Sequence, residues 1–209
     1  MFLGGTFSHA ILKTPAIEDF RVQPRHLSHW CGHVYLPSAT MRHMNGEDDP
    51  RLTLRPPNPA DVQALAALHV RCWRQAYAHL LPTEFFDDLL GSRLIMWTSV
   101  LAQESLPPRL VVAERDTDLV GFAWAGASQG ADPARELELY AIYLDAQQYG
   151  SGVGQMMLDE VLGASPAQLW VAAENPRARA FYTRNGFQPD GASFIDPDAH
   201  DMEEVRLIR

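Results

Sequence analysis

Residues 138–158 have the sequence ELYAIYLDAQQYGSGVGQMML. The beginning of this stretch is apolar enough for a strand, the middle carries Gly150, Gly152 and Gly154, and the end is apolar enough for a helix. Glycines let backbone amides approach an anion closely, and the N-terminus of a helix adds a partial positive charge. The stretch therefore predicts a strand, a turn and a helix, in which the turn either binds a phosphate group or only joins the two elements.

Two common phosphate-binding motifs do not fit this turn. A dinucleotide fingerprint needs a third glycine, but Gln155 stands there when the count begins at Gly150, and Met157 when it begins at Gly152. A nucleotide P-loop needs a lysine after its last glycine, and the only lysine of the chain is Lys13. The turn is thus expected to serve neither kind of site.

The chain around this stretch alternates between strand-like and helix-like segments from residue 51 onward. Asn58 and Pro59 are typical of a helix start, and the polar segment 114–118 is typical of a hairpin turn. We expect strands at 51–55, 109–113, 119–127, 137–144, 169–173 and 204–208, and helices at 59–78, at 83–102 with an optional break at Gly91-Ser92, from the glycine turn to 162, and at 175–186. The prediction is a mixed α/β domain over residues 51–209 with a sheet of six or seven strands.

Residues 1–50 lack a regular apolar pattern, and we expect a poorly ordered N-terminal extension there. The segment contains His26, His29, Cys31 and His33, which could bind a metal, but no second ligand pair follows at zinc-finger spacing, so no metal site is predicted. Met41 or Met44 stands just ahead of the first strand, so an alternative is that translation starts there.

Composition narrows the class of protein. The chain of 209 residues is 46% hydrophobic and 21% charged, with a formal net charge of -9. These values are typical of a globular protein and argue against nucleic acid as a partner, while mildly favouring a cationic one. No apolar run is long enough to span a membrane, the N-terminus does not resemble a signal peptide, and only two cysteines are present, so we expect a cytoplasmic protein.

A second motif lies in residues 169–187, with the sequence LWVAAENPRARAFYTRNGF. In this order, the two stretches resemble the GNAT family of N-acetyltransferases. The family's acyl-CoA motif, Gln or Arg, two residues, Gly, one residue and Gly or Ala, falls on Tyr149, Gly152 and Gly154, with Gln148 one residue early. Tyr149 departs from that pattern and puts a side-chain contact to the pyrophosphate in question. The later motif matches Asn175, Ala178, Phe181, Tyr182, Gly186 and Phe187.

The resemblance implies a fold and a donor. The fold is a mostly antiparallel sheet of six to seven strands with about four helices, and the donor is acetyl-CoA, bound where the strand ending near Leu144 parts from the strand ending near Ala173. The pantetheine arm would pair along the strand edge. Residues expected to bind acetyl-CoA are Tyr143, Leu144, Tyr149, Gly150, Ser151, Gly152, Val153, Gly154, Asn175 and Arg179. Asn175 is equally suited to cap the helix that follows it.

The resemblance also implies an amine that attacks the thioester directly. Tyr182 matches the tyrosine that protonates the departing thiolate, although it could instead be a core aromatic residue. A base is required because a lysine-like amine is mostly protonated at neutral pH. We choose Glu138 for this role; Glu136, on the same face of the strand, and ordered water are the alternatives.

The sequence gives the least information about the acceptor substrate. Trp73 and Tyr77 are one helical turn apart and could wall the acceptor pocket, although core packing is the commoner role for such residues. The sequence thus predicts an N-acetyltransferase that acts on a primary amine of a small molecule or peptide, as a monomer or homodimer. The alternatives are a non-catalytic acyl-CoA-binding module and a structural or interaction protein.

Overall fold

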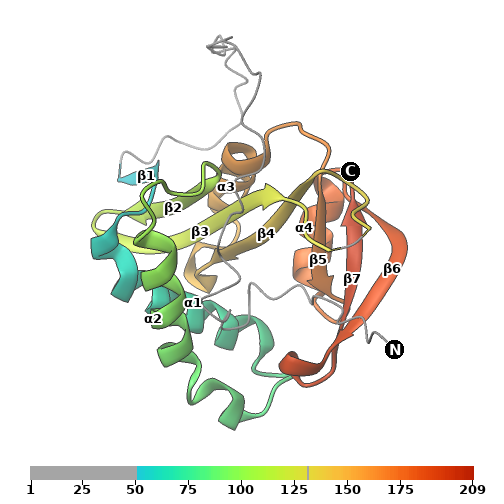
Figure 1. Cartoon of the computed structure of the whole chain (residues 1–209), viewed down its shortest axis with the longest axis horizontal. Helices are drawn as coiled ribbons and strands as arrows, with labels where there is room; N and C mark the ends of the chain where they lie inside the picture. The colour runs from blue at the N-terminus through green and yellow to red at the C-terminus, as the bar shows by residue number, and fades with distance from the viewer. Residues whose placement is uncertain (1–50, 131) are drawn as a thin grey trace, which may run out of the picture.

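The computed structural model describes residues 51–130 and 132–209. The predicted extension at 1–50, with its candidate metal ligands and alternative start, lies outside the described residues. The described chain forms a seven-stranded sheet with helices on both faces (Figure 1). The mixed α/β fold expected from the sequence is therefore confirmed.

The sheet is antiparallel except for one pair of strands. Its order is β1-β2-β3-β4-β5-β7-β6, and only β4 and β5 run parallel. The strands are β1 (Leu52–Arg55), β2 (Leu110–Arg115), β3 (Asp118–Ala127), β4 (Leu137–Leu144), β5 (Gln168–Ala172), β6 (Gln188–Asp196) and β7 (Met202–Ile208). The α-helices are α1 (Val62–Tyr77), α2 (Leu89–Leu101), α3 (Val153–Leu162) and α4 (Pro176–Arg184).

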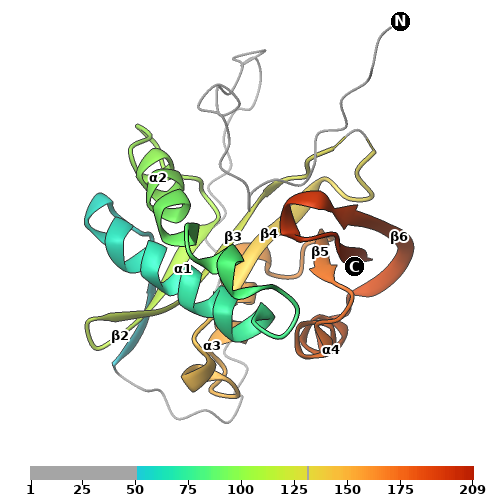
Figure 2. The same cartoon turned by 90° about the horizontal axis from the view of Figure 1, so that it is seen from below.

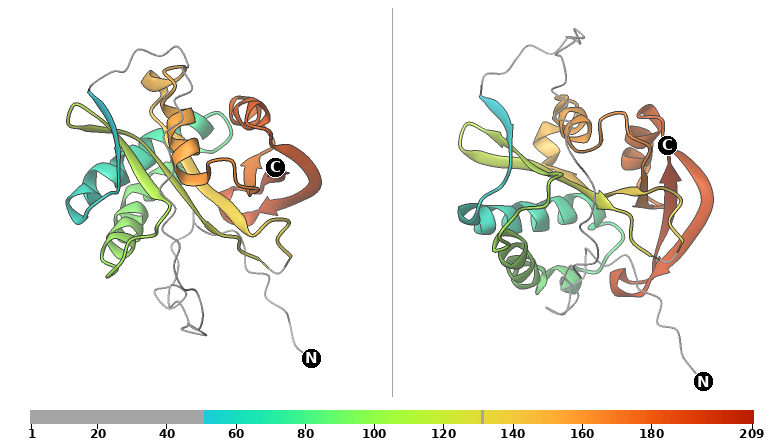
Figure 3. Two further views of the ribbon diagram at one scale, coloured as in Figure 1. Left: turned by 90° about the horizontal axis from the view of Figure 1, so that it is seen from above. Right: turned by 45° about the horizontal axis from the view of Figure 1, so that its top comes forward.

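The two faces of the sheet bury separate cores. Alternate residues of a strand point to opposite faces, so Val111 packs with α3 and α4 while Val112 packs with α1 and α2. Figure 2 and Figure 3 show α1 and α2 together on one side of the sheet and α3 on the other. No described helix is long and apolar enough to cross a membrane.

The sequence prediction missed strand β6 and misplaced one helix break. β6 carries Pro189 and Gly191, and its residues are mostly exposed, so it has no apolar stripe; it is held by pairing with β7. The break in the second helical segment lies at residues 87–88, between a 3-10 turn at Thr83–Phe86 and α2, and not at Gly91-Ser92. α2 continues through Gly91 because its buried residues keep helical spacing on both sides.

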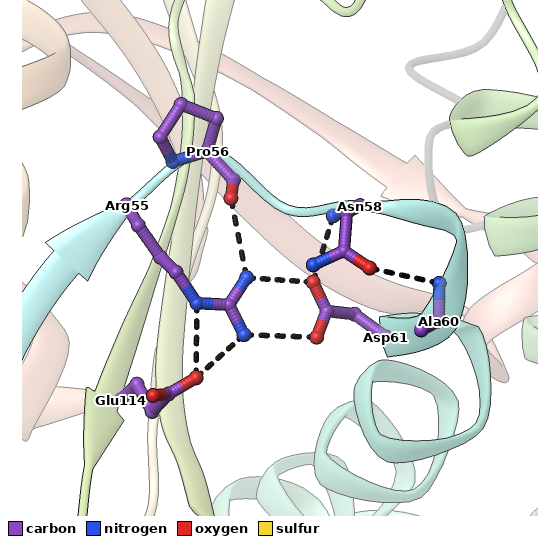
Figure 4. A network of polar contacts seen from close by, with 6 residues as sticks. All are labelled: Arg55, Pro56, Asn58, Ala60, Asp61 and Glu114. Carbon is purple, nitrogen blue, oxygen red and sulfur yellow. Dashed lines mark hydrogen bonds and ion pairs between the residues drawn. The ribbon is translucent and has the colours of Figure 1, made fainter. Parts of the chain in front are cut away.

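An ion-pair network fastens the start of α1 to the sheet (Figure 4). Arg55 lies between Asp61 and Glu114, with nitrogen–oxygen distances of 2.7 and 2.6 Å. The Asn58 side chain accepts a hydrogen bond from the amide of Ala60, and Asp61 accepts one from the amide of Asn58. The predicted cap at Asn58 is thus present, although it caps a 3-10 turn at Pro59–Asp61 from which α1 continues.

Candidate active site

The central feature of the site is the separation of β4 from β5. The two strands pair only at their beginnings, where Glu138 faces Gln168 and Leu139 faces Leu169. Further on, β5 continues with β7 and β4 continues with β3. A cavity of about 710 Å³ lies where the strands part, and residues 138–144 of β4 line it. The unpaired strand edge offers backbone groups to an extended ligand.

A β-bulge in β4 accounts for this separation. Leu139 pairs with Ala125 and Ala141 pairs with Trp124, so Tyr140 is an extra residue on its strand. A bulge bends its strand and increases the local twist. The Tyr140 hydroxyl donates a hydrogen bond to the carbonyl of Ala127, which anchors the extra residue to β3. The bulge therefore turns β4 away at the point where its pairing with β5 stops.

The predicted glycine turn joins β4 to α3 at the end of the cavity. Gly150 and Gly152 have φ angles of +79° and +88°, which glycine adopts without strain. Gly152 is the N-cap of α3 and has no side chain to cap the helix, and the neighbouring Ser151 hydroxyl accepts only a long hydrogen bond, 3.5 Å, from the amide of Val153. The first N–H groups of a helix have no partner within it, and both Gly152 and Gly154 line the cavity. The turn thus presents an anion-binding geometry.

Arg177 supplies a positive charge beside this turn. Its guanidinium lies 4.3 Å from the centre of the Tyr149 ring, and both side chains line the cavity. Asn175 also lines the cavity while its Oδ1 atom accepts a hydrogen bond from the amide of Ala178. Arg179, by contrast, is not among the lining residues, and its Nη1 atom donates to the carbonyl of Ala173 at 3.1 Å.

Of the other residues predicted to bind acetyl-CoA, some line the cavity and some do not. Tyr143, Leu144, Tyr149 and Gly150 line the cavity. Ser151 and Val153 do not: the Ser151 hydroxyl donates to the carbonyl of Gln148, and the Val153 side chain is fully buried in the core below α3. Their backbone amides still belong to the turn and to the first turn of α3.

Tyr182 is buried at the wall of the cavity. Its ring packs against Phe181 and Phe187, and only 7% of the residue is exposed. Burial raises the pKa of its hydroxyl well above the usual value, and Tyr77 adds to this effect. The hydroxyl therefore stays protonated across the neutral range and can donate a proton or a hydrogen bond.

Glu138 is a buried carboxylate with protein partners. It lines the cavity, and its Oε2 atom accepts hydrogen bonds from Gln168 Nε2 at 2.8 Å and from the amide of Gln129 at 3.3 Å. Burial raises its pKa, while these hydrogen bonds oppose the shift. Glu136, the alternative base, is exposed, precedes β4 and is not a lining residue.

Glu204 is a second buried carboxylate, which the sequence prediction missed. It lies on β7 opposite Ala172 of β5, and it lines the cavity. Burial, together with the negative charges of Asp196 and Glu138, raises its pKa to about 7. The available signal was the alternation of the final strand, which places Glu204 on the side opposite Val205 and Leu207. A glutamate on that polar side is normally exposed to solvent.

The two predicted acceptor-wall residues differ in position. Trp73 is 1% exposed and packs in the core, 5.0 Å from the Tyr77 ring and 5.6 Å from the Phe85 ring. Tyr77 itself lines the cavity, and burial raises its pKa to about 12. Tyr77 can therefore touch a ligand, whereas Trp73 supports it from behind.

The cavity has no arrangement of side chains suited to a metal ion. No group of three or more His, Cys, Asp and Glu residues that could hold one is found within 51–130 and 132–209. The chemistry that the lining residues can perform is proton transfer next to an anion-binding turn.

Comparison with known proteins identifies the family. The family model for "Acetyltransferase (GNAT) family" matches residues 62–187, a span that contains both sequence motifs and most of the cavity wall. The chain belongs to the GNAT family. The family resemblance stated from the two motifs is thereby confirmed.

Relatives and solved structures agree with this membership. "Probable N-acetyltransferase Rv2775" of Mycobacterium tuberculosis is 29% identical over 153 residues, which cover 68% of this chain and 83% of that protein. The crystal structure of PaiA N-acetyltransferase from Thermoplasma acidophilum in complex with coenzyme A has a TM-score of 0.57 at 20% identity, covering 74% of this chain and 97% of that one. Arabidopsis thaliana Naa50, in complex with the bisubstrate analogue CoA-Ac-MVNAL, has a TM-score of 0.51 at 14% identity, covering 76% and 98%.

The site of this GNAT chain combines motif residues with residues outside the motifs' pattern. The glycine turn, Asn175 and Tyr182 come from the two motifs. Arg177 and Glu204 do not, yet Arg177 is the arginine beside the turn and Glu204 is the β7 carboxylate opposite the last residue of β5. These two residues are specific features on which the chemistry of this member can depend.

Proposed function

We propose that this GNAT protein transfers an acetyl group from acetyl-CoA to a primary amine of a small molecule or peptide. The observation that carries the proposal is the cavity between β4 and β5, with the glycine turn at one end and Tyr182 in its wall. The CoA complex of PaiA and the bisubstrate complex of Naa50 support the choice of donor and of an amine acceptor.

The lining residues fit the parts of acetyl-CoA. The amides at the start of α3 and the Arg177 guanidinium suit the pyrophosphate. The unpaired edge of β4, from Tyr140 to Leu144, suits the amide groups of the pantetheine arm. In this arrangement the thioester lies near Tyr182, at the end of the arm.

The proposed chemistry is a direct transfer. The amine nitrogen attacks the thioester carbon, and the carbon–sulfur bond breaks as the tetrahedral intermediate collapses. Tyr182 protonates the departing thiolate, a role that its raised pKa permits because the hydroxyl is still protonated at neutral pH. A buried carboxylate takes a proton from the amine. Glu138 is the sequence-predicted residue for that step, and Glu204 is the second candidate.

The setting of the reaction is also a proposal. We propose that residues 51–209 form the catalytic domain and that the protein works in the cytoplasm, without nucleic acid, as a monomer or homodimer. The low number of cysteines and the excess of acidic residues support this setting.

The test is an acceptor screen with the full chain. Acetyl-CoA is incubated with propylamine, tyramine or a peptide with a free N-terminus, and CoA thiol release and the mass of the acetylated product are measured. We expect Tyr182→Phe to lower turnover about 10²-fold or more, because it removes the proton donor. Acetyl-CoA should still protect this variant from thermal unfolding.

Two results would count against transfer. If acetyl-CoA protects the protein but no amine is acetylated, the chain is better described as a non-catalytic acyl-CoA-binding module. If Tyr182→Phe turns over at the wild-type rate, Tyr182 is a core aromatic residue and not the acid.

A further inference from the structure

The two buried carboxylates of the cavity stand at different ends of β5. Glu138 faces Gln168, the first residue of β5, and Glu204 faces Ala172, the last. Four residues of an extended strand span about 13 Å. The chain turns from the end of β5 into α4, the helix that carries Tyr182. Glu204 is therefore the carboxylate at the same end of β5 as the start of that helix.

The electrostatic neighbours of the two groups support this placement. Tyr77 acts on the pKa of Tyr182, and Glu204 acts on the pKa of Tyr77, so Tyr77 lies within reach of both. The neighbours that act on Glu138 are Gln168, Gln129 and Arg206, and neither Tyr77 nor Tyr182 is among them. Glu204 thus shares an environment with the proposed acid.

The hydrogen bonding of the carboxylates differs as well. Glu138 accepts hydrogen bonds from Gln168 and from the amide of Gln129. In residues 51–130 and 132–209, no hydrogen bond to the Glu204 carboxylate is found. A carboxylate that already accepts hydrogen bonds from protein donors is a poor proton acceptor. A carboxylate without such bonds that lines a cavity can receive a proton from a ligand.

The groups that interact electrostatically with Glu204 are acids and phenols, while Arg206, two residues along on the same side of β7, acts on Glu138. The acids and phenols are Asp196 of β6, Glu138 and Tyr143 of β4, and Tyr77 of α1. Burial and these acidic neighbours bring the pKa of Glu204 to about 7. A base with a pKa near the working pH combines a substantial ionised fraction with useful basicity.

We propose that Glu204, and not Glu138, accepts the proton of the attacking amine, an inference that rests on the proposed acetyl transfer. The ammonium N–H bond breaks and its proton passes to the Glu204 carboxylate. The neutral nitrogen bonds to the thioester carbon, the carbon–sulfur bond breaks, and the thiolate takes the Tyr182 proton. The tyrosine oxygen recovers a proton from the nitrogen of the product, and Glu204 releases its proton to water.

The experiment compares two acceptors of different basicity in the full chain. Propylamine is protonated at neutral pH and needs a base before it can attack, whereas hydroxylamine is already largely neutral. We expect Glu204→Gln to lose about 10²- to 10⁴-fold in kcat/KM with propylamine and less than about tenfold with hydroxylamine. Wild-type turnover of propylamine should fall as pH drops below about 7, since Glu204 is then protonated.

Glu203→Gln is the matched control. It makes the same substitution at the adjacent, exposed residue of β7, so we expect wild-type rates with both acceptors. Thermal protection by acetyl-CoA should be the same in the wild type and in both variants, which separates a lost base from a lost donor site.

Three outcomes would overturn the inference. If the propylamine-selective loss appears in Glu138→Gln and not in Glu204→Gln, the base is Glu138. If Glu204→Gln loses equal activity with both acceptors, Glu204 acts on the structure of the site. If the wild type releases CoA with propylamine, hydroxylamine and the screened amines no faster than the same mixtures without protein, the proposed transfer itself is wrong, and this inference is wrong with it.

Discussion

At the scale of single residues, burial suits Tyr182 to act as an acid and Glu204 to act as a base. Removal from water penalises the charged form of both groups and raises the pKa of each. The tyrosine consequently remains an acid throughout the neutral range, while the carboxyl group, starting from an ordinary value of 4.5, becomes a base poised near pH 7. Burial thus contributes to both halves of the proposed proton-transfer pair.

The raised pKa of Glu204 also predicts a pH-dependent loss of stability. As pH rises from 4.5 to about 7, the unfolded chain ionises this group while the folded protein keeps it protonated, so the folded state loses about 3 kcal/mol relative to the unfolded state. Glu204→Gln should lack this loss. Urea unfolding of wild type and variant at both pH values measures it.

The expected result is a stability difference between variant and wild type that shifts toward the variant by about 3 kcal/mol between the two pH values. Glu203→Gln, which changes an exposed neighbour, should follow the wild type. Parallel pH profiles for the wild type and Glu204→Gln would mean that the Glu204 carboxyl has an ordinary pKa.

Sequence reasoning put forward Tyr182 from a motif, Glu138 from its place on the strand and Tyr77 from helical spacing. All three line the cavity, and their roles stay predictions. Glu204 was missed because β7 buries its Val205 and Leu207 side in the core, and the opposite side of an edge-region strand is usually solvated. Only the departure of β4 from β5 makes that side the wall of a cavity.

At the scale of elements, a bulge and a turn build the site. The extra residue Tyr140 bends β4 away from β5, and the turn at 150–152 then starts α3 beside the opening. Apolar alternation and the three glycines predicted β4, the turn and α3 from sequence alone. The bulge could not be predicted, because it depends on the pairing of β4 with β3.

Gly154→Ala separates the fold from the binding role of the turn. An added Cβ would lie 3.8 Å from Phe181 and 3.9 Å from Leu144, which are ordinary contacts, and alanine favours a helix by up to about 1 kcal/mol over glycine. We expect unchanged or greater stability. Acetyl-CoA should nevertheless bind at least about tenfold more weakly, about 1.4 kcal/mol, because the methyl group stands beside the amides proposed to hold the pyrophosphate.

Gly91→Ala provides the comparison for this variant. It is a helical glycine on the exposed surface of α2, and an added Cβ meets nothing within 4 Å. Its stability should also be unchanged or greater, with acetyl-CoA affinity as in the wild type. Equal affinities in the two variants, measured by titration calorimetry, would contradict close approach of the donor to the glycine turn.

At the scale of the whole molecule, the sheet lies between two hydrophobic cores, one on each face. α1 and α2 cover one face and α3 and α4 the other, and the cavity runs where β4 leaves β5. The chain carries a net charge of -9, so its overall field opposes an anionic donor and favours a cationic acceptor. In the proposed function, donor binding therefore relies on local features, namely the amides of the turn and Arg177.

The most direct test of an acetyl-CoA site between β4 and β5 is thermal unfolding of the purified full chain with and without acetyl-CoA, with NADH and ATP as controls. A ligand at 100 times its dissociation constant adds about 2.7 kcal/mol of stability. We predict a higher melting temperature with acetyl-CoA alone. An unchanged melting temperature at millimolar acetyl-CoA, or an equal rise with NADH or ATP, would contradict an acetyl-CoA site in this cavity.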